Sequence, residues 1–445
     1  MKRIFYFAVM AAFMFTSCSK EESINITPSG EKAALDLVIS FPAATKAADS
    51  NASAADTKVT DVTVFVFNDN GSFAGMNGGN VPVTFVPADF TINTATNTYT
   101  LVEGKRITTT AGPVKIYVGI NLPAALKSMA TENALKAEYA AGISVLADAT
   151  NGITMLSAVK PATLKAQEAG STPTLASNKV AVTVERLVSK VAARQATSTT
   201  GPFANGFTVA ADQFSVGNIA THIYPVQRIE NSVLVTPMKN STAVGNLVAL
   251  NASATSVTDA AFRSFYVSEH RPSINNLRRE ATYAVVRGAI TFTGFAYVDA
   301  GVIKVDGTPT LPAAGGKIYM VRDNVAGNAT YFCKDLSDAS LVVGRLTNAT
   351  IHEYIVATDG KVYCFYYIFL NKTETDALAV YRNQFFDISV GNVTGMGYPG
   401  DPVNPDKPAT VIPDPDVPVI PTAAYLEVVV DVKEWDYKPI NTTLE

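Results

Sequence analysis

Apolar and polar positions alternate along most of this chain, and the alternation predicts many short β-strands. Residues 33–41 and residues 425–434 show it most regularly. Their apolar faces are formed by Leu35, Leu37, Ile39 and Phe41 in the first strand and by Leu426, Val428, Val430 and Val432 in the second. Further strands are predicted at residues 62–67, 113–120, 152–158, 180–191, 282–290, 316–321, 362–370 and 381–390.

The predicted strands fall into two groups with little helix between them. One helical stretch is predicted at residues 122–141, where Leu126, Met129 and Leu135 share an apolar side. Small and turn-forming residues at 198–202 indicate a boundary between the groups. We therefore expect a mostly β protein with two β-sandwich domains, although the order of the strands does not follow from the sequence.

The first residues carry a processing signal. Lys2 and Arg3 precede an apolar stretch, residues 4–15, that is too short to span a bilayer, which favours a cleaved signal peptide. Phe15-Thr16-Ser17 followed by Cys18 looks like a bacterial lipobox, so Cys18 is the candidate lipidation site. The alternative is an ordinary signal peptide with a chance cysteine.

Two segments lack the pattern of a core element. Residues 42–57 are mostly small and include Lys46, so we expect an exposed loop that proteases can reach. Residues 399–421 hold eight of the 23 prolines. Such a segment is expected to be extended and semi-rigid, with a reach on the order of 70 Å in the polyproline II conformation.

Composition and charge narrow the function. The 445 residues are 47% hydrophobic and 17% charged, with a formal net charge of -4, so the bulk of the chain is expected to fold. Basic residues form no stripe, which argues against a nucleic-acid partner. The three histidines, His222, His270 and His352, are far apart in sequence and lack the spacing of a zinc site. We predict no catalytic residues, no metal and no cofactor.

Two further features have alternative interpretations. Cys333 and Cys364 lie on predicted strands and form either a disulfide or two buried thiols. The aromatic strand at 363–369 is either a packed core strand or a platform for sugar binding.

Several motifs occur in an order that resembles the FimA-like fimbrillins of the Bacteroidetes type V pilus. Each motif is degenerate alone, and together they span nearly the whole chain. Besides the lipobox at Cys18 and the first strand, they are Lys58-Val59-Thr60-Asp61-Val62, Val114-Lys115-Ile116-Tyr117-Val118-Gly119-Ile120-Asn121, Val184-Glu185-Arg186-Leu187-Val188, Tyr381-Arg382-Asn383, Val393-Thr394-Gly395 and Val432-Lys433-Glu434-Trp435.

The resemblance implies two transthyretin-like β-sandwich domains and a lipidated precursor that polymerises by strand exchange. A trypsin-like protease would cut after Lys46, where the family has arginine, and remove the first strand. The strand carrying Leu426, Val428, Val430 and Val432 of another subunit would then fill the groove. The implied segments are a signal peptide (1–17), a propeptide (18–46), N-terminal and C-terminal sandwiches (47–197 and 198–394), a proline-rich linker (395–422) and the donor strand (423–445).

The function expected from the resemblance is that of a non-enzymatic structural pilin, most plausibly of the stalk, in an adhesive surface fimbrium. Its partners would be other copies or related fimbrial subunits, the processing protease and, before processing, the outer membrane through the lipid. One alternative is a fimbrial anchor subunit, which would keep its lipid and first strand. The other is a monomeric surface lipoprotein that binds glycans. The sequence does not name the adhesion target.

We expect the precursor to be acylated at Cys18, because a thiol follows a short apolar signal and small residues. Labelled palmitate should enter the wild-type precursor and be lost in Cys18→Ala. Equal labelling of both proteins would contradict the lipobox interpretation.

Overall fold

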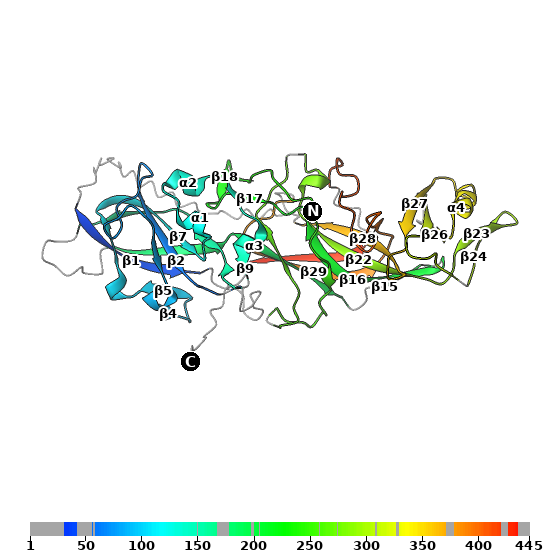
Figure 1. The fold of residues 1–445 in the computed structure, drawn as a ribbon, viewed down its shortest axis with the longest axis horizontal. Coiled ribbons are helices and arrows are strands. Elements are labelled where there is room, and N and C mark those ends of the chain that lie inside the picture. The colour runs from blue at the N-terminus through cyan, green and yellow to red at the C-terminus, as the bar shows by residue number, and fades with distance from the viewer. Residues whose placement is uncertain are drawn as a thin grey trace, which may run out of the picture.

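The computed structural model describes residues 31–41, 56, 58–148, 150–166, 178–196, 200–203, 205–257, 259–273, 275–307, 309–325, 329–370, 378–419 and 426–434. This part of the chain is mostly β and elongated, with the N-terminal half at one end (Figure 1). The predicted fold class, mostly β, is confirmed. The specific transthyretin-like arrangement stays a prediction.

The N-terminal half contains ten strands joined by hydrogen bonds. Their order is β3-β2-β7-β11-β13-β1-β5-β4, with β12 also on β7 and β6 also on β1. The bounds are β1 Lys32–Ser40, β2 Val62–Asn68, β3 Val83–Phe85, β4 Phe90–Asn93, β5 Thr98–Leu101, β6 Ile107–Thr110, β7 Gly112–Ile120, β11 Met155–Ser157, β12 Lys160–Leu164 and β13 Lys179–Arg186. One hydrophobic core takes side chains from both ends of this order, so the sheet folds over on itself around that core.

The C-terminal half is built on two further sheets. One has the order β21-β14-β29-β31, and the other has the order β15-β16-β22-β28-β30 with β20 on β16. The bounds are β14 Val188–Gln195, β15 Thr200–Phe203, β16 Phe207–Gly217, β20 Val248–Ala249, β21 Phe265–Ser268, β22 Tyr283–Phe292, β28 Val362–Phe369, β29 Gln384–Val393, β30 Tyr398–Pro399 and β31 Leu426–Glu434. The largest core cluster of the molecule lies between the two sheets and takes residues from both.

A smaller unit at the far end of the molecule is inserted between β22 and β28 (Figure 1). It contains the hairpin β23–β24, the sheet β26-β25-β27 and the helix α4, which packs on its own small core. Their bounds are β23 Ala296–Asp299, β24 Val302–Val305, β25 Lys317–Asp323, β26 Thr330–Cys333, α4 Leu336–Val343 and β27 Ala349–Ile355. The sequence analysis predicts β25 but not α4.

The remaining elements are short. The predicted helix at 122–141 is two helices, α1 (Ala124–Lys127) and α2 (Glu132–Lys136), because Thr131 caps a second start by accepting a hydrogen bond from the Ala134 N–H. The shared apolar side is confirmed, since Leu126 and Leu135 are fully buried. The others are α3 Ile143–Leu146, β8 Tyr139–Ala140, β9 Ala147–Asp148, β10 Gly152–Ile153, β17 His222–Ile223, β18 Arg228–Glu230, β19 Val233–Val235 and the 3₁₀ turns Pro87–Asp89, Glu103–Lys105 and Arg278–Glu280.

The chain passes from the first half to the second at Leu187. The strand predicted at 180–191 is two strands, β13 in the first sheet and β14 in the second. Leu187, Val188 and Phe385 share a core cluster with Leu126 and other side chains of the N-terminal half. The halves are therefore packed against each other through apolar side chains, and β14 joins the second sheet before the domain boundary expected at residues 197–198.

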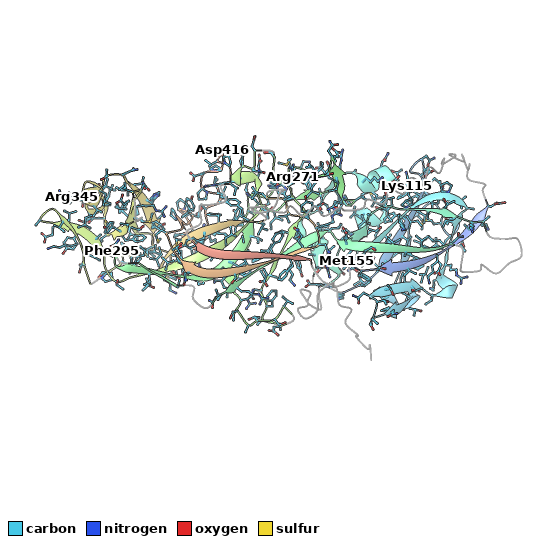
Figure 2. The ribbon with its side chains drawn as sticks, turned by 180° about the vertical axis from the view of Figure 1, so that it is seen from behind. Lys115, Met155, Arg271, Phe295, Arg345 and Asp416 are labelled. Atoms are coloured by element: carbon cyan, nitrogen blue, oxygen red, sulfur yellow. The ribbon has the colours of Figure 1, made fainter. Side chains whose placement is uncertain are left out.

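The proline-rich segment does not extend into solvent as the composition predicts. Ile412 is buried among side chains of β22 and β28, and the Val419 N–H donates to the Asn276 carbonyl. Arg278 donates to Asp414 at 3.0 Å, while Arg279 pairs with Asp416, which Figure 2 labels at the surface. The predicted extended conformation is wrong for part of this segment, because turns fold it back: the Asp401 N–H donates to the Lys407 carbonyl and the Val417 N–H donates to the Asp414 carbonyl. Residues 420–425 lie outside the described part.

Candidate functional site

The first strand, β1, occupies the middle of the N-terminal sheet. It runs parallel to β13, with Asp36 opposite Lys179 and Ser40 opposite Thr183, and antiparallel to β5 and β6 on its other side. Because β1 bonds on both edges, taking it out would leave two rows of backbone groups without partners. We call the slot between β13 and the β5–β6 pair the β1 groove.

The four apolar residues assigned to the displaced strand all point into the core. Leu35, Leu37 and Ile39 are fully buried, Phe41 is nearly so, and the Phe41 ring meets the Tyr99 ring edge-on at 5.1 Å. Burial of four such side chains contributes about 6–12 kcal/mol before entropy is subtracted. The alternation therefore identifies a strand that stabilises the N-terminal half strongly. Whether this strand is displaced stays a prediction.

Asp36 is the exception on this strand. Its side chain is only 4% exposed, and one carboxylate oxygen, Oδ1, has no hydrogen-bond partner. Burial raises the pKa of Asp36, while the positive charges of Lys179 and Arg106 lower it to a smaller extent. A buried carboxylate on an otherwise apolar strand was not singled out by the sequence pattern.

The segment that follows the predicted cleavage site is tied to the body at Asp56. This carboxylate is fully buried and contacts the Lys190 ammonium of β14 at 2.5 Å, and it also accepts a hydrogen bond from Tyr266 of β21. Burial lowers the pKa of Lys190, as does the charge of Arg186 nearby, whereas Asp56 raises it. Lys46 itself lies outside the described residues. The expected exposed loop at 42–57 thus ends in a buried ion pair.

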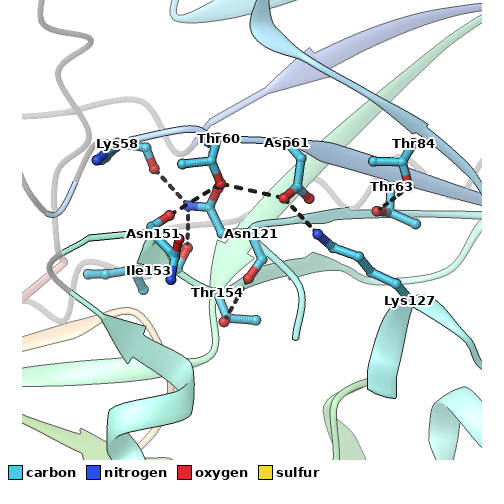
Figure 3. A network of polar contacts seen from close by, with 10 residues as sticks. All are labelled: Lys58, Thr60, Asp61, Thr63, Thr84, Asn121, Lys127, Asn151, Ile153 and Thr154. Carbon is cyan, nitrogen blue, oxygen red and sulfur yellow. Dashed lines mark hydrogen bonds and ion pairs between the residues drawn. The ribbon is translucent and has the colours of Figure 1, made fainter. Parts of the chain in front are cut away.

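Two residues later, a polar network fixes the start of the N-terminal body (Figure 3). Asn121 stands at the end of β7 with a left-handed backbone, and its Oδ1 accepts hydrogen bonds from the Thr60 N–H and hydroxyl. Its Nδ2 donates to the carbonyls of Lys58 and Ile153 at 2.7 and 3.1 Å. The two motifs that contain Lys58 and Asn121 therefore meet in space.

The motifs around Arg186 and Arg382 meet in the same way. Arg186 Nη1 donates to Asn383 Oδ1 at 3.0 Å, which connects the end of β13 to the residue that precedes β29. Arg382 forms a buried two-point ion pair with Glu269 and donates to the Pro225 and Tyr224 carbonyls. We call the set Asp56, Arg186, Lys190, Tyr266 and Asn383 the junction cluster, because it connects the segment before β2 to both halves.

The predicted donor strand is β31, which lies along β29 at the edge of its own sheet (Figures 1 and 2). Their pairing is antiparallel, from Gln384 opposite Glu434 to Val393 opposite Leu426, with a shift in register between Val390 and Val393. Among the described strands, β31 has a single neighbour, whereas β1 has neighbours on both sides. The side chains of Leu426, Val428, Val430 and Val432 are not described, so their role as donor residues stays a prediction.

The other candidate residues occupy ordinary structural positions. Cys333 and Cys364 are buried free thiols, and burial raises their pKa values to about 12 and about 11. On β28, Tyr363, Phe365 and Tyr366 are buried, as expected for a core strand and not for a sugar platform. Cys18 lies outside the described residues.

The described part of the chain shows neither a metal site nor a membrane-spanning helix. His270 is buried with Nε2 at 2.6 Å from the Glu280 carbonyl, and burial lowers its pKa. Among the described residues, His, Cys, Asp and Glu side chains form no group of three that could hold a metal ion. Within the same residues, no helix combines the length and apolar character needed to cross a membrane.

One protein family matches the C-terminal region of the chain. Residues 359–439 match the model of the major fimbrial subunit protein type IV, fimbrillin, C-terminal family. This region of the chain is therefore similar to the C-terminal part of fimbrillins, which supports a fimbrial subunit. No curated protein matches the chain significantly.

Solved structures with a similar chain path include fimbrial proteins. The fimbrilin FimA from Porphyromonas gingivalis has 15% identity and a TM-score of 0.46, with 92% of this chain and 99% of that chain covered. The tip fimbrial protein Mfa3 from the same organism, truncated at its C-terminus, has 12% identity and a TM-score of 0.38, covering 90% of this chain and 100% of its own. At these values the likeness carries no conclusion about function.

The junction cluster makes a prediction about stability. Asp56→Ala leaves the Lys190 ammonium buried without its carboxylate, and we expect the free energy of unfolding to fall by about 3–5 kcal/mol. Asp299→Ala is a matched control, because its pair with Lys304 is half exposed and contributes no more than about 1 kcal/mol. Urea unfolding monitored by circular dichroism measures both. Equal losses would contradict the anchoring role of Asp56.

The network around Asn121 makes a prediction about proteolysis. Brief trypsin digestion should cut first after Lys46, while Lys58 resists because its carbonyl and the neighbouring Thr60 are held by Asn121. Asn121→Ala should expose Lys58 to cleavage without changing the cut after Lys46. Mass spectrometry of timed digests distinguishes the sites. A first cut after Lys58, or inside either half, in the wild-type protein would show that the 42–57 segment is not the accessible one.

Proposed function

We propose that this protein is a structural fimbrial subunit, of the stalk, that polymerises by protease-triggered strand exchange. Proteolysis after Lys46 would cut the covalent connection of β1 to the body, and β31 of another subunit would replace it. The observation that carries the proposal is the position of β1, which is inserted between β13 and the β5–β6 pair and is bonded to no strand adjacent to it in sequence.

The position of β1 makes it removable without disrupting any hairpin. The next strand in the chain, β2, pairs with β3 and β7 and not with β1. The body that remains begins at the junction cluster, where Asp56 stays buried against Lys190. A cut after Lys46 therefore separates β1 from a body that keeps its own anchors.

The position of β31 supports its role as the incoming strand. In its own subunit it bonds on one edge only, whereas in a β1 groove it would bond on both edges and bury four apolar side chains. In the groove, β31 would form ladders of backbone hydrogen bonds on two edges and not on one. This gain favours exchange once β1 has left the groove. The lost translational freedom of association opposes it.

The alternatives remain distinguishable. An anchor subunit would keep Cys18 and β1, so N-terminal sequencing of protein sheared from cells should begin at Ala47 for a stalk subunit. The aromatic side chains at the start of β28 are buried, which removes the observation that suggested a glycan platform. The proposed function therefore stays with the fimbrial subunit.

Removal of the tail tests the mechanism. Deleting residues 423–445 should leave both halves folded, because each described core contains many buried side chains from other strands, and should abolish polymers after cleavage of the 42–57 segment. Val430→Asp should act similarly, since a carboxylate in the dry groove costs several kcal/mol. Val429→Asp is the matched control, because its place in the groove corresponds to half-buried Val38.

Native gels and electron microscopy of the cleaved proteins provide the readout, with circular dichroism as the check on folding. We expect ladders from the wild-type protein, weaker ladders from Val429→Asp and none from the deletion. Undiminished ladders from the deletion variant would exclude the tail as the donor.

A further inference from the structure

This inference rests on the proposed function and concerns the alignment of the incoming strand. In the β1 groove, two cations stand at the level of Asp36, one from each side. Lys179 is directly opposite Asp36 on β13. On the other edge, Leu35 pairs with Ile107 in antiparallel register, which places Arg106 at the level of Asp36. Both charges act on the Asp36 carboxylate.

Asp36 fits this place poorly. It is nearly buried, and its Oδ1 has no hydrogen-bond partner, while Lys179 is exposed. A carboxylate one methylene further from the backbone would reach toward the exposed ammonium and keep more of its hydration. The groove therefore has two positive charges beside the position of Asp36. Asp36 occupies this position with one carboxylate oxygen left without a hydrogen bond.

The tail has the same alternation as β1, with a glutamate where β1 has an aspartate. When Leu426, Val428, Val430 and Val432 take the places of Leu35, Leu37, Ile39 and Phe41, Glu427 takes the place of Asp36 and Val429 the place of Val38. Other alignments in the same direction lose the match or bury a charge. A shift by four, with Val430 at the place of Leu35, brings Asp431 to the cations but puts Glu434 at the place of buried Ile39. A shift by two residues, with Val428 at the place of Leu35, brings Val429 to the two cations. A shift by six, with Val432 there, brings Lys433.

We propose that Lys179 and Arg106 set the register of the incoming strand by receiving the carboxylate of Glu427 from a second copy of this chain. The strand then runs in the direction of β1, parallel to β13. Insertion in the opposite direction is the competing arrangement, because it places Asp431 at the same level and Leu426 at the place of Phe41. Glutamate is favoured over aspartate there, since the shorter Asp36 leaves an oxygen without a partner.

Charge reversal in the full-length protein tests the pairing. Each variant is purified, cleaved with trypsin and followed by native gel for the rate of ladder formation. We expect Glu427→Lys to slow assembly at least tenfold, and Lys179→Glu to slow it similarly. The double variant should recover most of the rate, because the opposite charges are restored in exchanged positions.

Asp431→Lys is the matched control, with the same change of charge on the same face of the tail, and it should slow assembly less than Glu427→Lys. The neutral variants Glu427→Gln and Lys179→Gln should have smaller effects than the reversals, and these effects should shrink as the salt concentration rises. Melting temperatures of the uncleaved proteins identify any variant that is unfolded, and the Gln variants then provide the comparison.

The outcomes separate this inference from the proposed function. Ladders that persist after deletion of residues 423–445 would defeat strand exchange itself. Ladders that need the tail but form equally well in Glu427→Lys and Asp431→Lys would leave strand exchange standing and overturn the register. A stronger effect of Asp431→Lys, or a double variant that does not recover, would overturn the pairing of Glu427 with Lys179.

Discussion

The architecture of the N-terminal half depends on a slot in its sheet that a strand must fill. β1 satisfies the backbone of β13 on one edge and of β5 and β6 on the other, and its apolar face completes the core. Unpaired backbone groups and an open core are both costly in water, so the empty slot is strongly disfavoured.

The polar clusters lie in the part of the molecule outside β1 and β31. Asp56 with Lys190, Asn121 with Thr60, and Arg186 with Asn383 each connect segments far apart in sequence. None of these six residues belongs to β1 or β31. Buried ion pairs contribute little net stability compared with apolar packing, but a broken pair is expensive, which makes such contacts specific for one arrangement. The body is thus defined independently of the strand in the slot.

Local patterns in the sequence were sufficient to predict the strands that bury one face in a core. β1, β7 and β13 alternate clearly, and β28 is a dense run of apolar residues. What could not be predicted depends on contacts between distant residues. Nothing near Asp56 or Asp36 indicates burial, the proline segment 399–419 is held by Arg278 and its neighbours, and the crossing at Leu187 follows from the packing of both halves. The sequence motifs include Asn121, Arg186 and Asn383. They do not show that Asn121 contacts the motif of Lys58, or that Arg186 contacts Asn383.

The parallel pairing of β1 with β13 also has a consequence for biogenesis. Asp36 and Lys179 are partners, so the first half cannot close until the chain has emerged well beyond residue 179. Pairing over such a sequence separation is slow, because the entropy of closing the loop opposes it before any contact is gained. During synthesis the early strand must therefore remain unpaired until residues beyond 179 have emerged. This topology requires that the exposed apolar strand be protected from aggregation during that time.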